Sequence, residues 1–150
     1  MIYREEQRDL FTVPCDYWLA HCISSDFALG GGIALAFVKR FNMRKMLFEN
    51  FPVLDWHNTG YVRVVPGIPV FNLITKQHVY QKPTYKNLVE AVEAMRDYAV
   101  THNIRKIAMP LIGCGIDGLN WIKVSAHVQR IFKDIDIEIL VCIRQEVWHE

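Results

Sequence analysis

The chain has 150 residues, of which 51% are hydrophobic and 22% charged, and its formal net charge is +1. This length suits one domain with a continuous core, and the composition excludes a disordered chain. The near-neutral charge gives no general attraction to nucleic acid or to a membrane surface, so such a partner requires a local patch.

The N-terminal segment and the cysteines indicate the compartment. The first nine residues form a charged segment that lacks the apolar middle of a signal peptide, and the longest apolar stretch, Phe27–Val38, is too short to cross a bilayer. We therefore expect a soluble protein of the cytoplasm, or of the nucleus if the source is eukaryotic, with no membrane partner. The four cysteines lack metal-ligand spacing and are predicted to be reduced and mostly buried. No metal and no cofactor is predicted.

Five apolar runs of strand length recur along the chain: Tyr17–Ile23, Tyr61–Val65, Val70–Ile74, Ile107–Ile112 and Ile137–Ile143. They are nearly continuous rather than alternating, which is typical of strands covered on both faces. The segment before Asp9 is a candidate edge strand. The stretch from Met43 to Gly60 has no clear pattern, and the tail 145–150 is a candidate contact near the ligand or between subunits.

Helical patterns separate these strands. One helix begins at the triple glycine Gly30–Gly32, a second runs from a Thr84 cap to about His102, and a third runs from an Asn120 cap to about Lys133. The third helix is expected to bury Ile122, Val124, Val128, Ile131 and Phe132. The alternation of strands and helices predicts an α/β fold whose central sheet is largely parallel.

Two glycine loops follow predicted strands, at Gly30–Gly32 and at Gly113-Cys114-Gly115. Glycine lets the backbone approach a phosphate closely and direct N–H groups at it. Each loop alone also fits an ordinary tight turn, but two of them at strand ends favour a pyrophosphate-like ligand. Cys114 is an alternative nucleophile, although the spacing identifies no base for it.

Lys76 and Asp117 are the candidate catalytic pair. Lys76 ends a predicted strand, where it is either a solvated charge or an amine able to attack a sugar carbon. Asp117 lies in the second glycine loop and favours the charged ammonium. The pair either exchanges a proton, or Lys76 acts as a fixed positive charge, and both readings remain open.

Asp9 and a basic cluster have two interpretations each. Asp9 either accepts a hydrogen bond from an exocyclic amine such as that of adenine, or caps a turn. The basic residues from Lys39 to Lys45, including Arg44, are either a solvated helix face or a nucleic-acid contact.

Taken in order, these segments resemble the macrodomain family. The likeness runs from about Asp9 to about Ile143, and its closest part is the subclass of terminal ADP-ribose protein glycohydrolases, with similarity also to DNA ADP-ribosyl glycohydrolase antitoxin macrodomains. Its anchors are Asp9-Leu10-Phe11, Leu19–Ser24, Gly30–Ala34, Leu73–Lys76, Lys82–Tyr85 and Met109–Asp117. Arg8 stands where many members have glycine.

The resemblance implies a single macrodomain over residues 1–150, with a three-layer α/β/α fold, a mixed and largely parallel sheet, and ADP-ribose bound over the strand ends. The residues that match ADP-ribose contacts are Asp9, Leu10, Ser24, Gly30, Gly31, Gly32, Ile33, Thr75, Leu111, Ile112, Gly113, Cys114, Gly115 and Ile116. In this likeness Asp9 holds adenine and the glycine loops hold the diphosphate and distal ribose.

The resemblance also implies an enzyme. The lysine that matches Lys76 attacks the anomeric carbon linked to an acidic side chain, and the aspartate that matches Asp117 resolves the intermediate. The expected partner is ADP-ribose or an ADP-ribosylated protein, with O-acyl-ADP-ribose as a further substrate. Alternatives are a non-catalytic ADP-ribose reader and a glycohydrolase acting on a nucleobase in DNA, which the net charge does not support.

Overall fold

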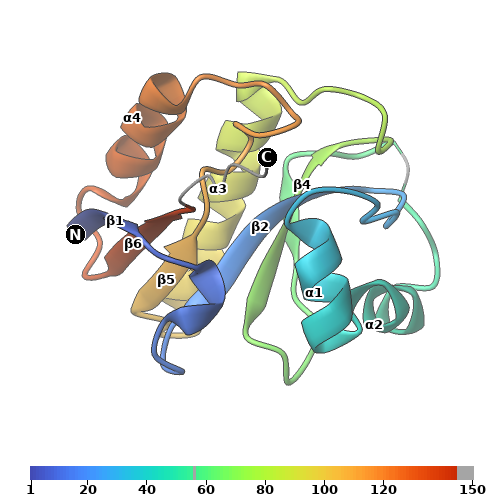
Figure 1. Cartoon of the computed structure of the whole chain (residues 1–150), viewed down its shortest axis with the longest axis horizontal. Helices are drawn as coiled ribbons and strands as arrows, with labels where there is room; N and C mark the ends of the chain where they lie inside the picture. Colours follow the sequence, from blue (N-terminus) through green and yellow to red (C-terminus); the bar gives the residue numbers. More distant parts are fainter. Residues whose placement is uncertain (56, 145–150) are drawn as a thin grey trace, which may run out of the picture.

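The computed structural model describes residues 1–55 and 57–144, so the tail 145–150 lies outside the described residues. Within them, one six-stranded sheet is flanked by helices (Figure 1). The strands are β1 (Ile2–Gln7), β2 (Trp18–Ser24), β3 (Tyr61–Arg63), β4 (Val70–Lys76), β5 (Lys106–Met109) and β6 (Glu138–Ile143). The helices are the 3-10 turn η1 (Leu10–Thr12), α1 (Ala34–Phe41), α2 (Met43–Asn50), α3 (Tyr85–Thr101) and α4 (Trp121–Phe132).

The sheet is mixed and largely parallel, as predicted. Its strand order is β1-β6-β5-β2-β4-β3, and among the described strands only the β3–β4 pair is antiparallel. The candidate edge strand is confirmed as β1, which pairs with β6 from Ile2 opposite Glu138. The carboxyl ends of five strands therefore lie along the same edge of the sheet.

Helices cover both faces of the sheet and produce the expected three layers. α3 and α4 pack on one face, whereas η1, α1 and α2 pack on the other (Figure 1). Successive residues of a strand point to opposite faces, so β4 sends Phe71 and Leu73 to the α3–α4 side and Val70 and Ile74 to the α1–α2 side. Both faces are buried, which explains the continuous apolar runs in the sequence.

Both predicted helix caps are present. Thr84 Oγ1 accepts a hydrogen bond from the Asn87 backbone N–H at 3.1 Å, and Asn120 Oδ1 accepts one from the Lys123 N–H at 3.2 Å. These bonds satisfy backbone donors that have no partner inside the first helical turn. The expectation that α4 buries Ile122 is wrong, because this side chain is 79% exposed.

Three further details differ from the sequence predictions. β5 ends at Met109 instead of Ile112, because Pro110 lacks the N–H that a continuing ladder needs. α2 was not anticipated; Asn42, with φ of 53°, separates it from α1. All four cysteines are free, but only Cys142 is fully buried. None of the described helices has the length and apolar character needed to span a membrane.

Candidate active site

The carboxyl ends of β1, β2, β4 and β5, with the segments that follow them, carry every residue predicted for the site. Four strand steps separate β1 from β4 in the sheet. At about 4.8 Å per step, this edge spans roughly 19 Å. Ligands of parallel sheets bind at this edge.

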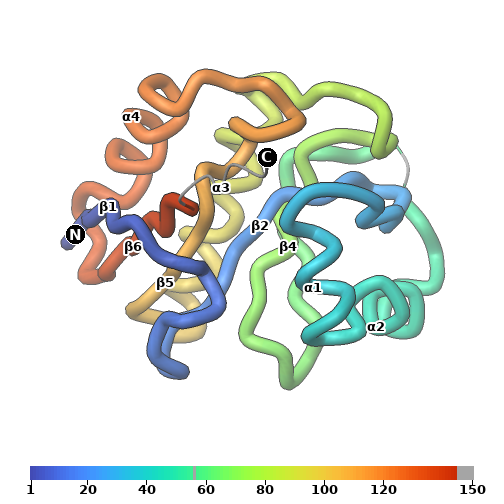
Figure 2. Tube along the Cα trace, viewed as in Figure 1, coloured from blue at the N-terminus to red at the C-terminus, as the bar shows by residue number. Residues whose placement is uncertain are grey.

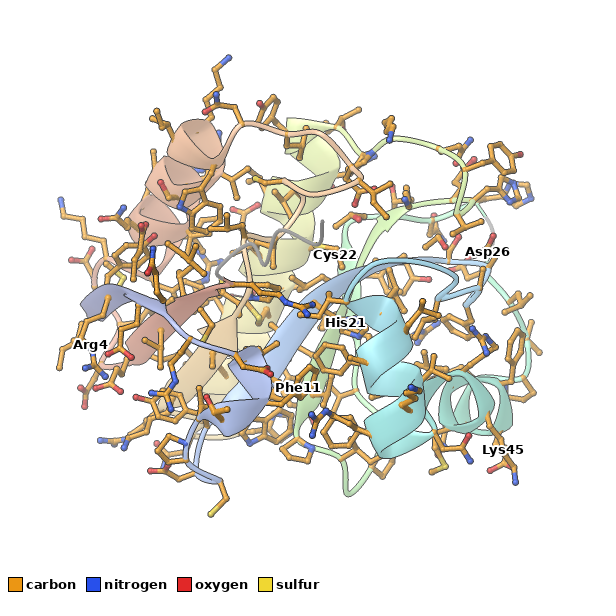
Figure 3. All side chains as sticks on the ribbon, viewed as in Figure 1. Arg4, Phe11, His21, Cys22, Asp26 and Lys45 are labelled. Atoms are coloured by element: carbon orange, nitrogen blue, oxygen red, sulfur yellow. The ribbon has the colours of Figure 1, made fainter. Side chains whose placement is uncertain are left out.

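Asp26 joins the loop after β2 to the loop after β4. Its Oδ1 accepts a hydrogen bond from Ser24 Oγ at 2.5 Å, and its Oδ2 accepts one from the Val79 backbone N–H at 3.1 Å. The Ser25 N–H also donates to Lys76 O at 2.9 Å. Figure 3 shows Asp26 beyond the end of β2. The hydroxyl of Ser24, a residue predicted to contact the ligand, therefore donates its proton within the protein.

The segment that precedes Gly30–Gly32 has a strained backbone, which Arg44 holds in place. Phe27 and Leu29 have φ of 54° and 45°, in the left-handed region, yet both side chains are buried. Such a backbone persists only where the surroundings hold it. Arg44 does so by donating to Ala28 O at 2.8 Å and to Leu29 O at 3.0 Å. Arg44 is thus not part of a solvated face.

The two glycine loops meet at Ile116. A Cβ at Gly31 or Gly32 would lie 3.4 or 3.5 Å from Ile116 Cδ1, and Gly32 also has a φ of +59°. A Cβ at Gly30 would meet nothing within 4 Å. Ile33 is the N-cap of α1 and gives no side-chain cap, so the start of this helix suits an anion.

The second glycine loop contains a tight turn that favours glycine at position 113. Gly113 has a φ of +73°, and a Cβ there would lie 3.1 Å from Leu119 Cδ1. The Leu119 N–H donates to Gly113 O at 2.8 Å, which closes the turn. Lys82 Nζ donates to Ile116 O from the loop after β4. Burial varies along the loop: Ile112 and Gly113 are buried, Leu111 and Cys114 half-buried, and Gly115 and Ile116 exposed.

Lys76 and Asp117 lie together between these loops. Lys76 Nζ donates to Asp117 Oδ1 at 2.7 Å, and the side chains are only 11% and 15% exposed. Partial burial strengthens such a pair because less water screens it. Thr75, the preceding residue and a predicted ligand contact, is fully buried.

The nearby thiols are poor nucleophiles. Burial, and then the charge of Asp117, raise the pKa of Cys22 to about 12 and that of Cys114 to about 11. Both thiols therefore stay protonated near neutral pH, and the nucleophile is the thiolate. No three or more His, Cys, Asp or Glu side chains gather into a possible metal site within the described residues.

Asp9 and Leu10 lie at the opposite end of the edge from Lys76. Asp9 is the N-cap of η1, where its Oδ1 accepts a hydrogen bond from the Phe11 N–H at 2.9 Å. Leu10 is buried against the α1–α2 side of the sheet. Arg8 donates to Thr12 O at 2.8 Å and braces this turn.

Three residues that shape the site were missed as site residues: Asp26, Arg44 and Lys82. Each acts through contacts to a loop of irregular shape, and the periodicity of hydrophobic residues does not predict such contacts. The sequence contains one indication that Lys82 lies near the ligand-binding edge of the sheet, because Lys82 precedes the Pro83-Thr84 entry to α3.

Comparison with known proteins identifies the family. The model of the Macro domain family matches residues 20–128, which include most of β2, all of β4 and β5, and both glycine loops. The chain belongs to the Macro domain family. Two curated relatives of this macrodomain are the human and bovine proteins named ADP-ribose glycohydrolase OARD1. They are 39% and 38% identical over 135 residues, which cover 89% of this chain and 86% of each relative.

Solved structures share the fold at lower identity. The macrodomain of Thermus aquaticus DarG has a TM-score of 0.79 and 23% identity, covering 94% of this chain and 97% of that one. Thermosipho africanus DarTG in complex with ADP-ribose has a TM-score of 0.75 and 15% identity, covering 99% of this chain and 43% of that one. At these identities the likeness concerns the macrodomain fold alone.

Proposed function

We propose that this macrodomain binds ADP-ribose along the carboxyl edge of its sheet and hydrolyses it from acidic protein side chains. The observation that carries the proposal is the 2.7 Å pair between Lys76 and Asp117, held between two glycine loops. Its support is the 39% identity to a protein named ADP-ribose glycohydrolase. A module that only binds ADP-ribose has no need for a half-buried amine and carboxylate at this place.

The edge of the sheet suits an extended nucleotide sugar. Asp9 uses one carboxylate oxygen to cap η1, and we assign adenine to this end. The glycine loops and the start of α1 offer backbone N–H groups to the diphosphate. The distal ribose then reaches Lys76 at the other end of an edge that spans roughly 19 Å.

Lys76 and Asp117 divide the chemistry. Asp117 accepts a proton from the Lys76 ammonium, and the neutral amine attacks the anomeric carbon. The bond from that carbon to the ester oxygen breaks, and its electron pair leaves with the carboxylate. Water, which loses a proton to solvent, then bonds to the anomeric carbon while the carbon–nitrogen bond breaks and its electron pair returns to the lysine amine, and Asp117 gives its proton back to that amine. If Lys76 instead stays an ammonium, it stabilises the leaving charge while Asp117 activates water.

Substitution of the lysine tests the proposal. We expect Lys76→Ala to release ADP-ribose from a glutamate-linked peptide about 100-fold more slowly, because it lacks both nucleophile and charge. ADP-ribose affinity, measured by calorimetry, should change little. Asp117→Ala should also lose turnover and, on the covalent route, accumulate a lysine-linked adduct visible by mass spectrometry.

A matched control is Lys86→Ala, an exposed lysine on α3. Unchanged turnover in Lys76→Ala would remove this lysine from the mechanism, and wild-type binding without release from any substrate would establish a reader. Serine-linked and thymidine-linked ADP-ribose, assayed in parallel, decide between protein and DNA as the target.

A further inference from the structure

A polar hollow of about 370 Å³ borders Lys76 and is not used by ADP-ribose in the arrangement above. Its lining residues are Thr59, Lys76, Gln77, Gln81, Lys82 and Asn87. We propose that this hollow receives the departing acidic side chain, and that Lys82 is the residue that selects a carboxylate there. The inference rests on the proposed function and assigns the leaving-group side of the same site.

The hollow adjoins the reacting groups. Lys76 lines it and also bonds to Asp117, and Lys82 Nζ donates to the backbone oxygen of Ile116, the residue before Asp117. The loop after β4 and the loop after β5, green and orange in Figure 2, lie at the same end of the molecule. A group leaving the sugar at Lys76 therefore enters a space that Lys82 borders.

The charge of the hollow favours an anion. Among the described residues that line it are two lysines and no Asp or Glu. The Lys76 charge is matched by Asp117, whereas the Lys82 charge is directed at a neutral carbonyl. Glu90, further along α3, packs against Gly60 and does not line the hollow. One positive charge thus remains for the departing group.

The chemistry of the leaving group fits the unmatched positive charge of Lys82. When the bond between the anomeric carbon and the ester oxygen breaks, the electron pair leaves as a carboxylate. The parent acid has a pKa of about 4, so no proton donor is needed at neutral pH. A serine alkoxide or a nucleobase anion is far more basic and needs a proton during departure. An ammonium that supplies its charge and keeps its proton therefore meets the whole need of a departing carboxylate, but only part of the need of an alkoxide or a nucleobase.

The test uses Lys82→Met, which keeps the length of the side chain and removes its charge. We expect kcat/KM on a glutamate-linked ADP-ribosyl peptide to fall about tenfold, since Lys82 is exposed and partly screened by water. The Kd for free ADP-ribose should stay within about twofold, and Lys82→Arg should restore most of the activity. Lys86→Met is the matched control and should match wild type.

Three outcomes would overturn the inference: no loss in Lys82→Met, an equal loss on thymidine-linked ADP-ribose, or a parallel loss of ADP-ribose affinity. The last would show that Lys82 only braces the loop at Ile116. Wild-type turnover tests the proposed function separately. If wild type proves to be a reader, the inference is judged by binding: Lys82→Met must then weaken the glutamate-linked peptide and not free ADP-ribose.

Discussion

At the scale of single residues, His21 on β2 is the buried group most sensitive to pH (Figure 3). Its ring is stacked on Phe37 with centroids 3.8 Å apart, and its Nε2 lies 2.6 Å from Asn72 Oδ1. Because the amide oxygen only accepts hydrogen bonds, Nε2 carries the proton of a neutral ring. Burial lowers the pKa of His21 to about 4, against 6.5 for a free histidine.

This pKa predicts that the protein loses stability in mild acid. Between pH 6.5 and 4, His21 is protonated in the unfolded chain but stays neutral in the folded chain. The contribution of neutral His21 to the free energy of unfolding is therefore fully present above pH 6.5 and decreases as the pH falls. We expect a loss of about 2 to 3 kcal/mol from this group between pH 7 and 4.5. Urea unfolding at both pH values measures it.

The control for this prediction is His21→Gln, which can still donate to Asn72 but cannot gain a charge. Other groups titrate in both proteins, so the difference between their pH profiles isolates His21. Identical profiles for the two proteins would show that His21 does not titrate as its burial requires.

At the scale of elements, the loop between β2 and α1 links the fold to the ligand. Its left-handed residues Phe27 and Leu29 are unfavourable in isolation, and Arg44 of α2 holds the adjoining carbonyls. α2 thus does more than cover the sheet: it sets the path of the backbone into the glycine triplet.

We expect Arg44→Met to weaken ADP-ribose binding by about fivefold to tenfold, because two charge-assisted hydrogen bonds to the loop disappear. The free energy of unfolding should fall by only about 1 to 2 kcal/mol. Calorimetric titration with ADP-ribose and urea unfolding measure the two effects.

Lys45→Met is the matched control. Lys45 is the next residue of α2, its side chain is 65% exposed, and it pairs with Glu49 at 3.8 Å across one helical turn (Figure 3). Surface pairs of this kind contribute little, so affinity should be unchanged. Equal affinities in the two variants would mean that the loop keeps its path without Arg44.

The sequence predicted elements well where local chemistry decides them. Thr84 and Asn120 are capping residues followed by helical spacing, and both caps are present. Ile122 was misassigned although its spacing was informative: α4 buries Val124, Val128 and Ile131, and a residue two positions before Val124 falls on the opposite face. α2 was missed because one left-handed residue, Asn42, interrupts an otherwise continuous helical stretch.

The part of the candidate site that the sheet topology brings together could be predicted from the sequence. Parallel strands place their carboxyl ends on one edge, so Lys76 and the loop of Asp117 were expected to be neighbours. Asp26, Arg44 and Lys82 bind backbone atoms of irregular loops, and no periodic pattern encodes such loops. The ligand contacts and catalytic roles assigned to the individual residues, and the single-domain boundary, stay predictions.

At the scale of the whole molecule, ADP-ribose would join segments that follow four different strands. A ligand that binds only the folded state at 100 times its Kd adds about 2.7 kcal/mol. For a chain of this size we expect a rise in Tm of roughly 5 to 10 °C. Thermal unfolding followed by circular dichroism measures the shift.

The control for this shift is an equimolar mixture of AMP and ribose 5-phosphate. It supplies the same chemical parts without joining them, so the rise in Tm should be clearly smaller. No shift with ADP-ribose would contradict binding to the native state.

The place of β1 at the margin of the sheet has a consequence for synthesis of the protein. β1 leaves the ribosome before the other strands of the sheet, yet its one neighbour among the described strands is β6, the last of them to emerge. Pairing at such sequence separation is slow, and until it occurs β1 has no partner strand. The turn that presents Asp9 is therefore completed late, so a nascent chain acquires the lysine end of its groove before the end assigned to adenine.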